Sequence, residues 1–237
     1  MPPTAASPSP GRNSTPGRTG SARKSPTRPG EAHIQHNGTT TLDRDAYIRS
    51  LREDLVFEDR LRDQPLTFHT TWGLFSPRGI DAGTRLLLDH VQVNPEDDCF
   101  DLGCGYGPIG LTLARLAPEG RTCLVDKDFV AVDYAARNAR INGIDNVDCF
   151  LSNGFSHAGE RRFHLITSNL PAKVGKEMLY LYLYDALDRL HPGGRIYVVT
   201  ITGLRRFIER AFKEVFGNYD KVKQGRDYTV ALARREA

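Results

Sequence analysis

The sequence predicts an α/β protein built on a doubly wound sheet, for three reasons. A short apolar stretch at Cys99–Leu102 runs into three glycines at alternate positions, and a helical pattern starts at Pro108. Strand and helix patterns alternate along the rest of the chain, as in a parallel sheet. The final pair of strands, around Gly225, has a loop too short for a parallel crossover. We therefore expect a Rossmann-like, seven-stranded and mainly parallel sheet whose last strand is antiparallel, preceded by a short helix and strand lead-in.

Composition divides the 237 residues into a tail, a lead-in and a core. Residues 1–38 are rich in Pro, Ser, Gly, Thr and Arg without apolar periodicity, which predicts a disordered basic tail. The chain has a net charge of +3, but residues 1–40 carry five basic residues against one acidic residue, so the remainder is close to neutral. We expect a lead-in at 39–95 and a core at 96–237, without a basic groove. The tail is interpreted as a solvated segment, an electrostatic tether to RNA or a transit peptide.

The lead-in contains two strand patterns between two helical ones. A short helix is expected over residues 43–52, followed by a strand at 55–57. Residues 66–72 alternate β-type side chains and predict a second strand. After a turn, Asp81 is placed to cap a helix with an apolar face.

Beyond the glycines, the chain alternates regularly between strands and helices. The His191-Pro192-Gly193-Gly194 sequence predicts the stop of a helix and a hairpin-type turn. Strands are expected at 122–126, 147–151, 163–167, 195–202, 220–223 and 229–233, and helices at 129–142, 176–190 and 204–216.

Several classes of protein are disfavoured by composition. None of the four cysteines forms a C-x-x-C pair, so we expect no metal site and interpret them as core residues of a cytoplasmic protein. No apolar run approaches the roughly 18 residues of a membrane span, and no signal-peptide pattern follows Met1. The protein is expected to be soluble, not secreted and not membrane-bound.

The register of the glycines bears on their ligand. Residues 105–110 spell G-x-G-x-x-G, but the strand ends at Leu102, so the tight turn begins at Gly103. The resulting pattern, Asp-x-Gly-x-Gly-x-Gly, resembles motif I of the class I S-adenosylmethionine (SAM) methyltransferases. The resemblance implies SAM as cofactor, bound by Asp101, Gly103, Gly105 and Gly107. A glycine-rich turn without a ligand is the alternative.

Two more polar residues follow strands. Asp126 lies about 20 residues beyond the glycine turn, where an acid binds ribose hydroxyls in SAM and nicotinamide enzymes alike. It is otherwise a helix cap, for which Asp128 is better placed. Asn153 is a candidate for hydrogen bonding an adenine edge, or else forms an Asn-Gly turn.

The segment 167–173 resembles the Asn-Pro-Pro-aromatic motif of methyltransferases that act on planar exocyclic amines. The resemblance implies that the Asn169 side chain, which also borders the cofactor, and the carbonyl of Leu170 accept the two N–H bonds of the amine, while Pro171 stiffens the backbone. This chain has Leu170 at the first proline and Ala172 at the aromatic position. An ordinary Asn-x-Pro loop is the alternative.

The lead-in narrows the family. Residues 68–88 are similar to the Gly-(Val/Leu)-Phe-Ser…(Leu/Ile)-Asp-x-Gly-(Ser/Thr)…Leu-Leu pattern of the small-subunit ribosomal RNA guanine-N2 methyltransferases, and the resemblance covers residues 43–235. It implies that the lead-in packs beside the SAM pocket, with Phe75 and Asp81 as substrate contacts, although Asp81 is also a helix cap. Basic residues expected at the rim, as phosphate contacts or as a solvated face, are Lys173, Lys176, Arg205 and Arg206.

The predicted function is transfer of a methyl group from SAM to an exocyclic amine of guanine in ribosomal RNA. The expected partner is small-subunit RNA or the assembled subunit. One alternative is a small molecule or a protein amide as the acceptor, and another is a SAM-binding RNA or ribosome-assembly module without turnover. A nicotinamide oxidoreductase is disfavoured by the glycine register and by the lack of an evident acid–base pair for hydride transfer.

Overall fold

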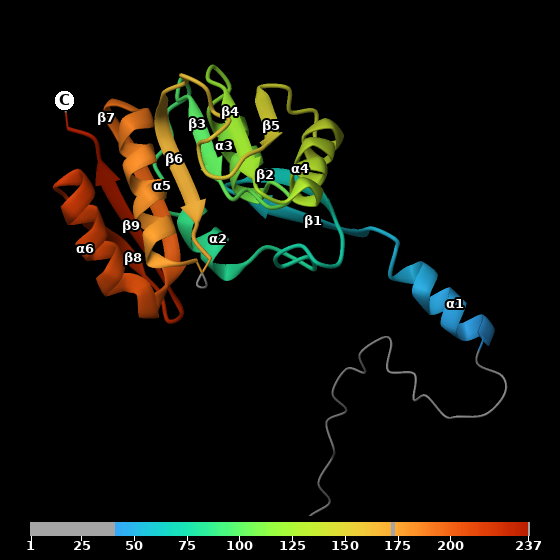
Figure 1. Cartoon of the computed structure of the whole chain (residues 1–237). Coiled ribbons are helices and arrows are strands. Elements are labelled where there is room, and N and C mark those ends of the chain that lie inside the picture. Colours follow the sequence, from blue (N-terminus) through green and yellow to red (C-terminus); the bar gives the residue numbers. More distant parts are fainter. Residues whose placement is uncertain (1–40, 172–173, 237) are drawn as a thin grey trace, which may run out of the picture. The chain divides into compact units, whose positions relative to one another are not determined.

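A computed structural model describes residues 41–171 and 174–236 (Figure 1). The tail expected at residues 1–38 lies outside the described residues. The lead-in contains α1 (Thr41–Ser50), β1 (Leu55–Leu61), β2 (Gln64–Thr70) and α2 (Ala82–Leu88). The core contains β3 (Cys99–Leu102), α3 (Pro108–Leu116), β4 (Thr122–Asp126), α4 (Phe129–Ile141), β5 (Val147–Leu151), β6 (Phe163–Asn169), α5 (Lys176–Arg189), β7 (Leu190–Ile201), the 3-10 helix η1 (Thr202–Leu204), α6 (Arg205–Phe216), β8 (Asp220–Gln224) and β9 (Tyr228–Arg234).

Among the described residues, seven strands form one sheet in the order β5-β4-β3-β6-β7-β9-β8. Neighbouring strands from β5 to β7 are parallel, whereas β9 runs antiparallel to β7 and β8. This confirms the predicted Rossmann-like sheet with its antiparallel last strand. The chain builds outward from β3 to β5 and then adds β6 on the other side of β3. Ligands bind beyond the carboxyl ends of the strands at such a reversal, so the site is expected beyond β3 and β6.

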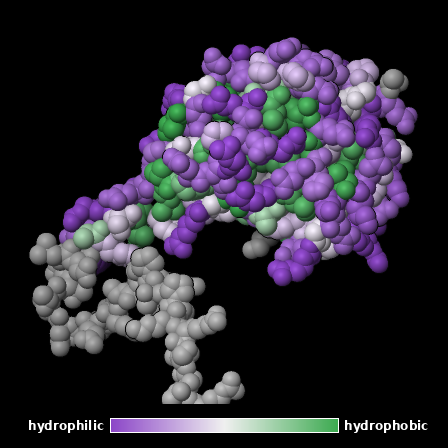
Figure 2. Space-filling model, turned by 180° about the vertical axis from the view of Figure 1, so that it is seen from behind, coloured by the Kyte–Doolittle hydropathy of each residue, from purple (hydrophilic) through white to green (hydrophobic). Residues whose placement is uncertain are grey.

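Helices cover both faces of this sheet (Figure 1). On one face, α2, α3 and α4 pack over an apolar cluster that also buries Leu66 and Phe68 of the lead-in. On the other face, α5 and α6 pack over a second cluster that includes Phe100, Phe155 and Phe212. Removal of this apolar surface from water is the main force that holds the layers together. The outer surface seen in Figure 2 is mostly hydrophilic, with hydrophobic side chains in separate places.

Two asparagines one helical turn apart fix the lead-in hairpin to α4. The side-chain amide of Asn138 accepts a hydrogen bond from the backbone N–H of His69 and donates one to the backbone carbonyl of His69. Asn142 makes the same pair of bonds with Thr67. Alternate residues of a strand present their backbone groups to one edge, so the two amides stand in for a neighbouring strand. These hydrogen bonds to Asn138 and Asn142, together with apolar packing, therefore hold β2 against α4.

The segment after α5 differs from the prediction. Residues 191–194 do not form a hairpin-type turn but lie inside β7. Leu190 already pairs with Phe163, and the ladder between β6 and β7 resumes at Arg195 with a shifted register. Gly193 adopts a φ of +76°, which lets the intervening residues leave the ladder. The two glycines thus form an irregularity within a strand and not a turn between elements.

Candidate active site

The carboxyl ends of the central strands surround a cavity of about 350 Å³. Its wall combines the glycine loop after β3, the end of β4, the segment after β6 and the start of β9. The lead-in contributes the loop before α2. The structure therefore brings together most of the predicted site residues. Those that line the cavity are Phe75, Asp81, Gly103, Gly105, Asp126, Asn169, Leu170 and Pro171.

The glycine loop takes a conformation that only glycine adopts at low cost. Gly103, Gly105 and Gly107 have φ angles of 76°, 56° and 98°, in the left-handed region. Other residues pay roughly 1–2 kcal/mol each to adopt this conformation. A β-carbon on Gly103 or Gly105 would meet no atom within 4 Å, so the space beside them is open. The loop turns tightly and leaves its backbone accessible to a ligand.

Asp101 lies behind the glycine loop and is not in the cavity wall. Its carboxylate is fully buried, accepts a hydrogen bond of 2.8 Å from the N–H of Gly110, and lies 3.4 Å from the hydroxyl of Thr167. Burial raises the pKa of Asp101 to about 7, and the charge of Asp126 adds to the rise. Gly110 belongs to the first turn of α3, so Asp101 ties this helix to β3. The direct cofactor contact that the family resemblance implies for Asp101 stays a prediction.

Asp126 ties the end of β4 to the glycine loop. One oxygen of its carboxylate accepts a hydrogen bond from the N–H of Gly105, and the other accepts one from the N–H of Asp128, both at 3.0 Å. Each oxygen keeps a further lone pair with which to accept a hydroxyl proton. The helix cap of α4 is Asp128, whose side chain accepts from the N–H of Val130 at 2.9 Å. The carboxylate of Asp126 is thus available at the cavity.

Asn153 is exposed and does not line this cavity. Its side-chain oxygen accepts a hydrogen bond of 3.2 Å from the hydroxyl of Tyr182, and it borders a separate, polar cavity of about 490 Å³ beside α5. Its neighbours Ser152 and Gly154 do line the main cavity. Gly154 has a φ of 63°, and a β-carbon there would lie 2.7 Å from the Tyr182 ring. The Asn-Gly turn is therefore present, and it lets Tyr182, which no sequence motif singles out, form part of the wall.

The lead-in holds the side-chain amide of Asn169 in one orientation. Its nitrogen donates to Oδ2 of Asp81 at 3.0 Å and to the hydroxyl oxygen of Thr84 at 3.1 Å. Because a carboxylate only accepts, the amide nitrogen must face Asp81 and the amide oxygen must face away from it. Within the described part of the chain, no hydrogen bond reaches that oxygen or the carbonyl of Leu170. Two acceptors therefore remain at the carboxyl end of β6.

Asp81 both caps a helix and lines the cavity, which are the two placements that the sequence allows for it. Its side chain caps α2, since Oδ2 accepts from the N–H groups of Gly83 and Thr84 at 2.9 and 3.2 Å. It also lines the cavity, and its other oxygen accepts a hydrogen bond of 2.9 Å from the hydroxyl of Tyr228. The capping role is thus present together with the contact to Asn169.

The replacement of the first proline of the Asn-Pro-Pro motif by Leu170 has a structural correlate. Leu170 is buried, and its N–H donates to the carbonyl of Val199 at 3.0 Å, a bond that proline cannot make. Pro171 is exposed and lines the cavity. The candidate substrate contact Lys173, together with Ala172, lies outside the described residues.

The loop before α2 presents aromatic side chains to solvent. Phe75 lines the cavity with 63% of its surface exposed. Trp72 is also exposed, and the guanidinium carbon of Arg78 lies 4.6 Å from the centre of its ring. Aromatic rings in this position are suited to stacking on a planar ligand.

Tyr106 links the glycine loop to the lead-in. Its hydroxyl donates to the carbonyls of Gly79 and Ser76 at 3.2 and 3.3 Å, and its ring packs edge-on against Phe68. The backbone carbonyl of Tyr106 accepts a hydrogen bond of 3.0 Å from Asn138. Tyr106 occupies a variable position of the glycine motif, so no sequence signal marks it.

The basic residues expected at the rim differ in their surroundings. Lys176 and Arg206 are exposed. Arg205 is half-buried and donates to the side chain of Gln224 at 2.6 Å. Lys127, which no sequence motif singles out, lines the cavity directly.

In residues 41–171 and 174–236, no group of three or more His, Cys, Asp or Glu side chains is arranged to hold a metal ion. In the same part of the chain, no helix has the length and apolar character to cross a bilayer. All four cysteines are free thiols, and Cys99, Cys104 and Cys123 are buried in the core.

The sheet order, the glycine loop and the cavity define a class I methyltransferase fold. Residues 65–232 match the methyltransferase small domain family, and the chain belongs to this family. The uncharacterized protein YbxB of Bacillus subtilis (strain 168) is 32% identical over 180 residues, which span 74% of this chain and 89% of that protein.

Solved structures agree with this assignment. The T. thermophilus 16S rRNA N2 G1207 methyltransferase RsmC, in complex with AdoMet (SAM) and guanosine, matches with a TM-score of 0.70 and 28% identity. The match covers 77% of this chain and 51% of RsmC, so the chain spans about half of that protein. A methyltransferase from Pyrococcus furiosus, at 22% identity and a TM-score of 0.56 over 70% of this chain and 91% of that one, shares the fold.

The chain is therefore a SAM-dependent methyltransferase. Two features of the cavity fit this cofactor. The backbone beside Gly103 and Gly105 is open to a ligand, and the carboxylate of Asp126 has lone pairs for hydroxyl groups.

Proposed function

We propose that the protein methylates an exocyclic amine of guanine in ribosomal RNA. The observation that carries the proposal is the pair of acceptors at the end of β6, the side-chain oxygen of Asn169 and the carbonyl of Leu170. An exocyclic amine presents two N–H bonds, which match two acceptors on adjacent residues. The similarity to RsmC supports guanine in small-subunit RNA as the acceptor.

SAM, when bound, would supply an electrophilic methyl group, whose bond to sulfur breaks as its bond to the amine nitrogen forms, with one proton of the amine released to solvent. In this proposal the backbone at Gly103 and Gly105 and the carboxylate of Asp126 hold the cofactor. Gly107, a predicted cofactor residue that does not line the cavity, lets the loop turn into α3. Asp101 contributes indirectly, by fixing α3 to β3 behind the loop. Asn153 contributes through the turn that places Ser152 and Gly154 in the wall.

The residues after β6 prepare the nucleophile. The lone pair of a guanine exocyclic amine is delocalised into the ring, which makes the nitrogen a poor nucleophile. Acceptors at Asn169 and Leu170 draw the two N–H bonds out of the ring plane and aim the lone pair at the methyl group. The N–H bonds become more acidic as the nitrogen gains its methyl group, so these contacts strengthen in the transition state. Pro171 keeps the backbone of this segment stiff.

The rim supplies contacts to the rest of the RNA. Ala172 carries no ring, so the exposed ring of Phe75 is the aromatic surface against which an extruded base stacks. The exposed side chains of Lys127, Lys176 and Arg206 are proposed to contact phosphates, which are the same at every position of the RNA sequence. Lys173 is proposed for the same task on its sequence position alone.

The test uses tritiated SAM and the purified protein. The acceptors are bulk RNA, assembled small ribosomal subunits, total protein and a small-molecule extract. We expect label in RNA, released as N2-methylguanosine. Asn169→Ala should lower this transfer by about 10²–10³-fold while SAM binding by calorimetry persists. The matched control is Asn94→Ala, since Asn94 is an exposed asparagine before β3, at the amino end of the sheet, and does not line the cavity.

Other outcomes separate the alternatives. Label in the protein or small-molecule fraction would change the acceptor and leave the role of Asn169 in place. SAM binding with no transfer to any fraction would contradict the proposal and indicate a binding module. Affinity for RNA should fall steeply with salt, because phosphate contacts release counterions.

A further inference from the structure

We propose that Asp81, Thr84 and Tyr228 are positioning residues for the methyl transfer, because together they fix and polarise the side-chain amide of Asn169. The inference rests on the proposed role of Asn169 and extends it to residues on α2 and β9. It gives the short sequence Asp81-Ala82-Gly83-Thr84 a part in the reaction beyond starting a helix.

Both hydrogens of the Asn169 amide nitrogen have acceptors. One acceptor is Oδ2 of Asp81 at 3.0 Å and the other is the hydroxyl oxygen of Thr84 at 3.1 Å. An amide flip would place the amide oxygen against a carboxylate, which is repulsive. The amide oxygen is thereby committed to the side on which the target amine binds.

The carboxylate of Asp81 is itself immobilised. Its Oδ2 accepts from the backbone N–H groups at the start of α2, and its Oδ1 accepts from the hydroxyl of Tyr228 at 2.9 Å. Burial and the hydrogen bond to Asp81 raise the pKa of Tyr228, so its hydroxyl stays protonated and keeps donating. Four donors therefore hold one carboxylate, including the amide of Asn169.

The reversed direction of β9 is what brings Tyr228 to this position. Tyr228 is the first residue of β9 and pairs with Ile201, the last residue of β7. In a parallel strand the first residue would lie at the opposite end of the sheet. Because β9 is antiparallel, the side chain of Tyr228 lies at the cavity.

Gly83 provides an independent observation that this arrangement is tightly fitted. A β-carbon at residue 83 would lie 2.8 Å from Oδ2 of Asp81 and 2.8 Å from the ring of Tyr228. Its backbone is not in the left-handed region, so the glycine is needed for space and not for its φ. Residues 81, 83 and 84 of the lead-in motif therefore all serve one cluster.

The cluster has a chemical consequence. Donation of both amide hydrogens, one of them to a carboxylate, shifts electron density toward the amide oxygen and makes it a stronger acceptor. The negative charge of Asp81 in the cavity wall also favours the positive charge that develops on the methylated nitrogen.

The activity test compares turnover with cofactor binding. Tyr228→Phe and Thr84→Val keep the ring and the side-chain shape but remove one hydroxyl each. With tritiated SAM and small ribosomal subunits as the probe, we expect kcat to fall by about tenfold or more in both variants. SAM affinity should stay within about twofold, because neither hydroxyl is proposed to touch the cofactor. Thr84→Ser, which restores an acceptor, should recover turnover.

The matched control is Tyr180→Phe. The hydroxyl of Tyr180 donates to Glu214 at 2.7 Å on the surface of α5, away from the cavity wall. It should leave kcat unchanged. Unchanged kcat in Tyr228→Phe and Thr84→Val, or a recovery that fails in Thr84→Ser, would overturn the inference.

A second measurement does not depend on the acceptor. The side-chain amide signals of Asn169 can be assigned by NMR through their loss in Asn169→Ala. In the parent protein both hydrogens should exchange slowly with water, and in Thr84→Val one of the two should exchange at least about tenfold faster. Equal exchange in parent and variant would refute the positioning role. If no RNA is methylated, the proposed function fails while this measurement still decides the inference.

Discussion

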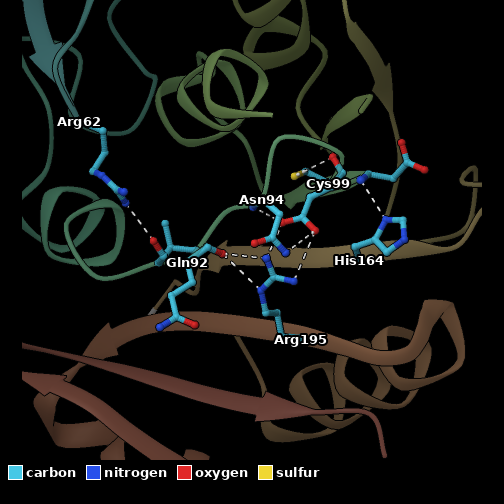
Figure 3. A network of polar contacts seen from close by, with 9 residues as sticks. Arg62, Gln92, Asn94, Cys99, His164 and Arg195 are labelled. Atoms are coloured by element: carbon cyan, nitrogen blue, oxygen red, sulfur yellow. Dashed lines mark hydrogen bonds and ion pairs between the residues drawn. The ribbon is translucent and has the colours of Figure 1, made fainter. Parts of the chain in front are cut away.

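The two ends of strand β3 each bury an aspartate, in opposite circumstances. At the amino end, Asp97 is only 2% exposed, and its carboxylate pairs with the guanidinium of Arg195 and accepts from the N–H of Asn94 at 2.7 Å. Figure 3 shows that the same guanidinium also reaches the carbonyl of Gln92. At the carboxyl end, Asp101 is fully buried, and among the described residues no cation bonds to it.

We interpret this difference as one between an end of the sheet where a cation pairs with the buried carboxylate and the end where ligands are proposed to bind. At the amino end, a full cation offsets the buried charge. At the carboxyl end, one N–H and one hydroxyl are the groups that stabilise the charged form of Asp101. The effect of burial is larger, so the pKa of Asp101 rises to about 7. The acceptors of Asn169 and Leu170 lie at this second end, beyond the neighbouring strand. Within the described residues, the two acceptors without a protein partner thus lie where the ligands are proposed to bind.

The largest predicted effect breaks the ion pair at the amino end. Arg195→Ala leaves the buried carboxylate of Asp97 without its cation, and it should lower the free energy of unfolding by about 3–5 kcal/mol in urea denaturation. The combined Asp97→Asn and Arg195→Met variant should recover most of this loss, because it buries no charge.

Arg121→Ala is the control for this prediction. Arg121 pairs with Asp148, but 58% of its side chain is exposed, so its loss should cost much less. A loss in Arg195→Ala no larger than that in Arg121→Ala would mean that the amino end is not the anchor we infer.

The second prediction concerns the carboxyl end and its pH dependence. The pKa of Asp101 is about 7 in the folded protein, against an ordinary value of 3.8. The contribution of Asp101 to the free energy of unfolding is therefore largest below its ordinary pKa. This contribution falls as the pH rises toward 7 and does not change further at higher pH. Between about pH 4 and pH 7 the contribution should fall by on the order of 3 kcal/mol.

Asp101→Asn removes this titration. The stability of the parent relative to the variant should therefore be greater near pH 4 than near pH 7.5, as measured by urea denaturation at both values. A difference that does not change with pH would show that the carboxylate of Asp101 keeps its ordinary pKa despite burial.

The third prediction separates strain from binding. Gly105 and Gly159 have similar φ angles, 56° and 63°, and a β-carbon on either would meet no atom within 4 Å. Alanine at either position should cost roughly 1–2 kcal/mol of stability. Only Gly105→Ala should also weaken SAM binding by calorimetry, because Gly105 lines the cavity. Equal SAM affinity in the two variants would contradict the placement of the cofactor at this loop.

The parts of the fold that the sequence predicted are those determined by neighbours along the chain. The order of strands and helices follows from local periodicity, and the turn at Gly103 follows from a strand, three glycines and a helix in succession. Asn169 and Asp126 are predictable from the sequence because each lies at the carboxyl end of a strand, and the carboxyl ends of parallel strands meet at one edge.

The contacts that the sequence did not reveal join residues far apart. Thr84 and Asn169 are 85 residues apart, and Tyr228 and Asp81 are 147 residues apart. No motif marks Tyr228, because its place depends on the pairing of β9 with β7. Asp101 belongs to the same motif as the glycines, but its side chain is buried and does not line the cavity.

The lead-in hairpin illustrates a further limit. Its turn residues Arg62 and Asp63 have φ angles of 50° and 63°, which normally favour glycine or asparagine. Arg62 donates hydrogen bonds of 2.8 and 2.9 Å to the carbonyls of Leu88, the last residue of α2, and of Val91, which follows the helix. A tertiary contact thus offsets an unfavourable local conformation, and no local signal predicts it.

The smallest predicted effect concerns a hydroxyl of β9 that lies opposite the carboxyl end of β7. Thr229 is buried next to Tyr228, and within the described residues its hydroxyl has no hydrogen-bond partner. Thr229→Val keeps the shape and removes the unsatisfied group, so it should raise the free energy of unfolding by up to about 1 kcal/mol. Thr229→Ser, which keeps a hydroxyl, should show no gain.

The same change at Thr122 completes the comparison of the two ends. Thr122 begins β4 at the amino end, and its hydroxyl is also buried without a partner in the part of the chain that the structure describes. Equal gains in Thr122→Val and Thr229→Val would mean that such hydroxyls are a packing feature of the whole sheet. A gain at Thr122 with a loss at Thr229 would instead assign the Thr229 hydroxyl to the site, through an interaction with its neighbour Tyr228. We expect equal gains, because neither hydroxyl lines the cavity.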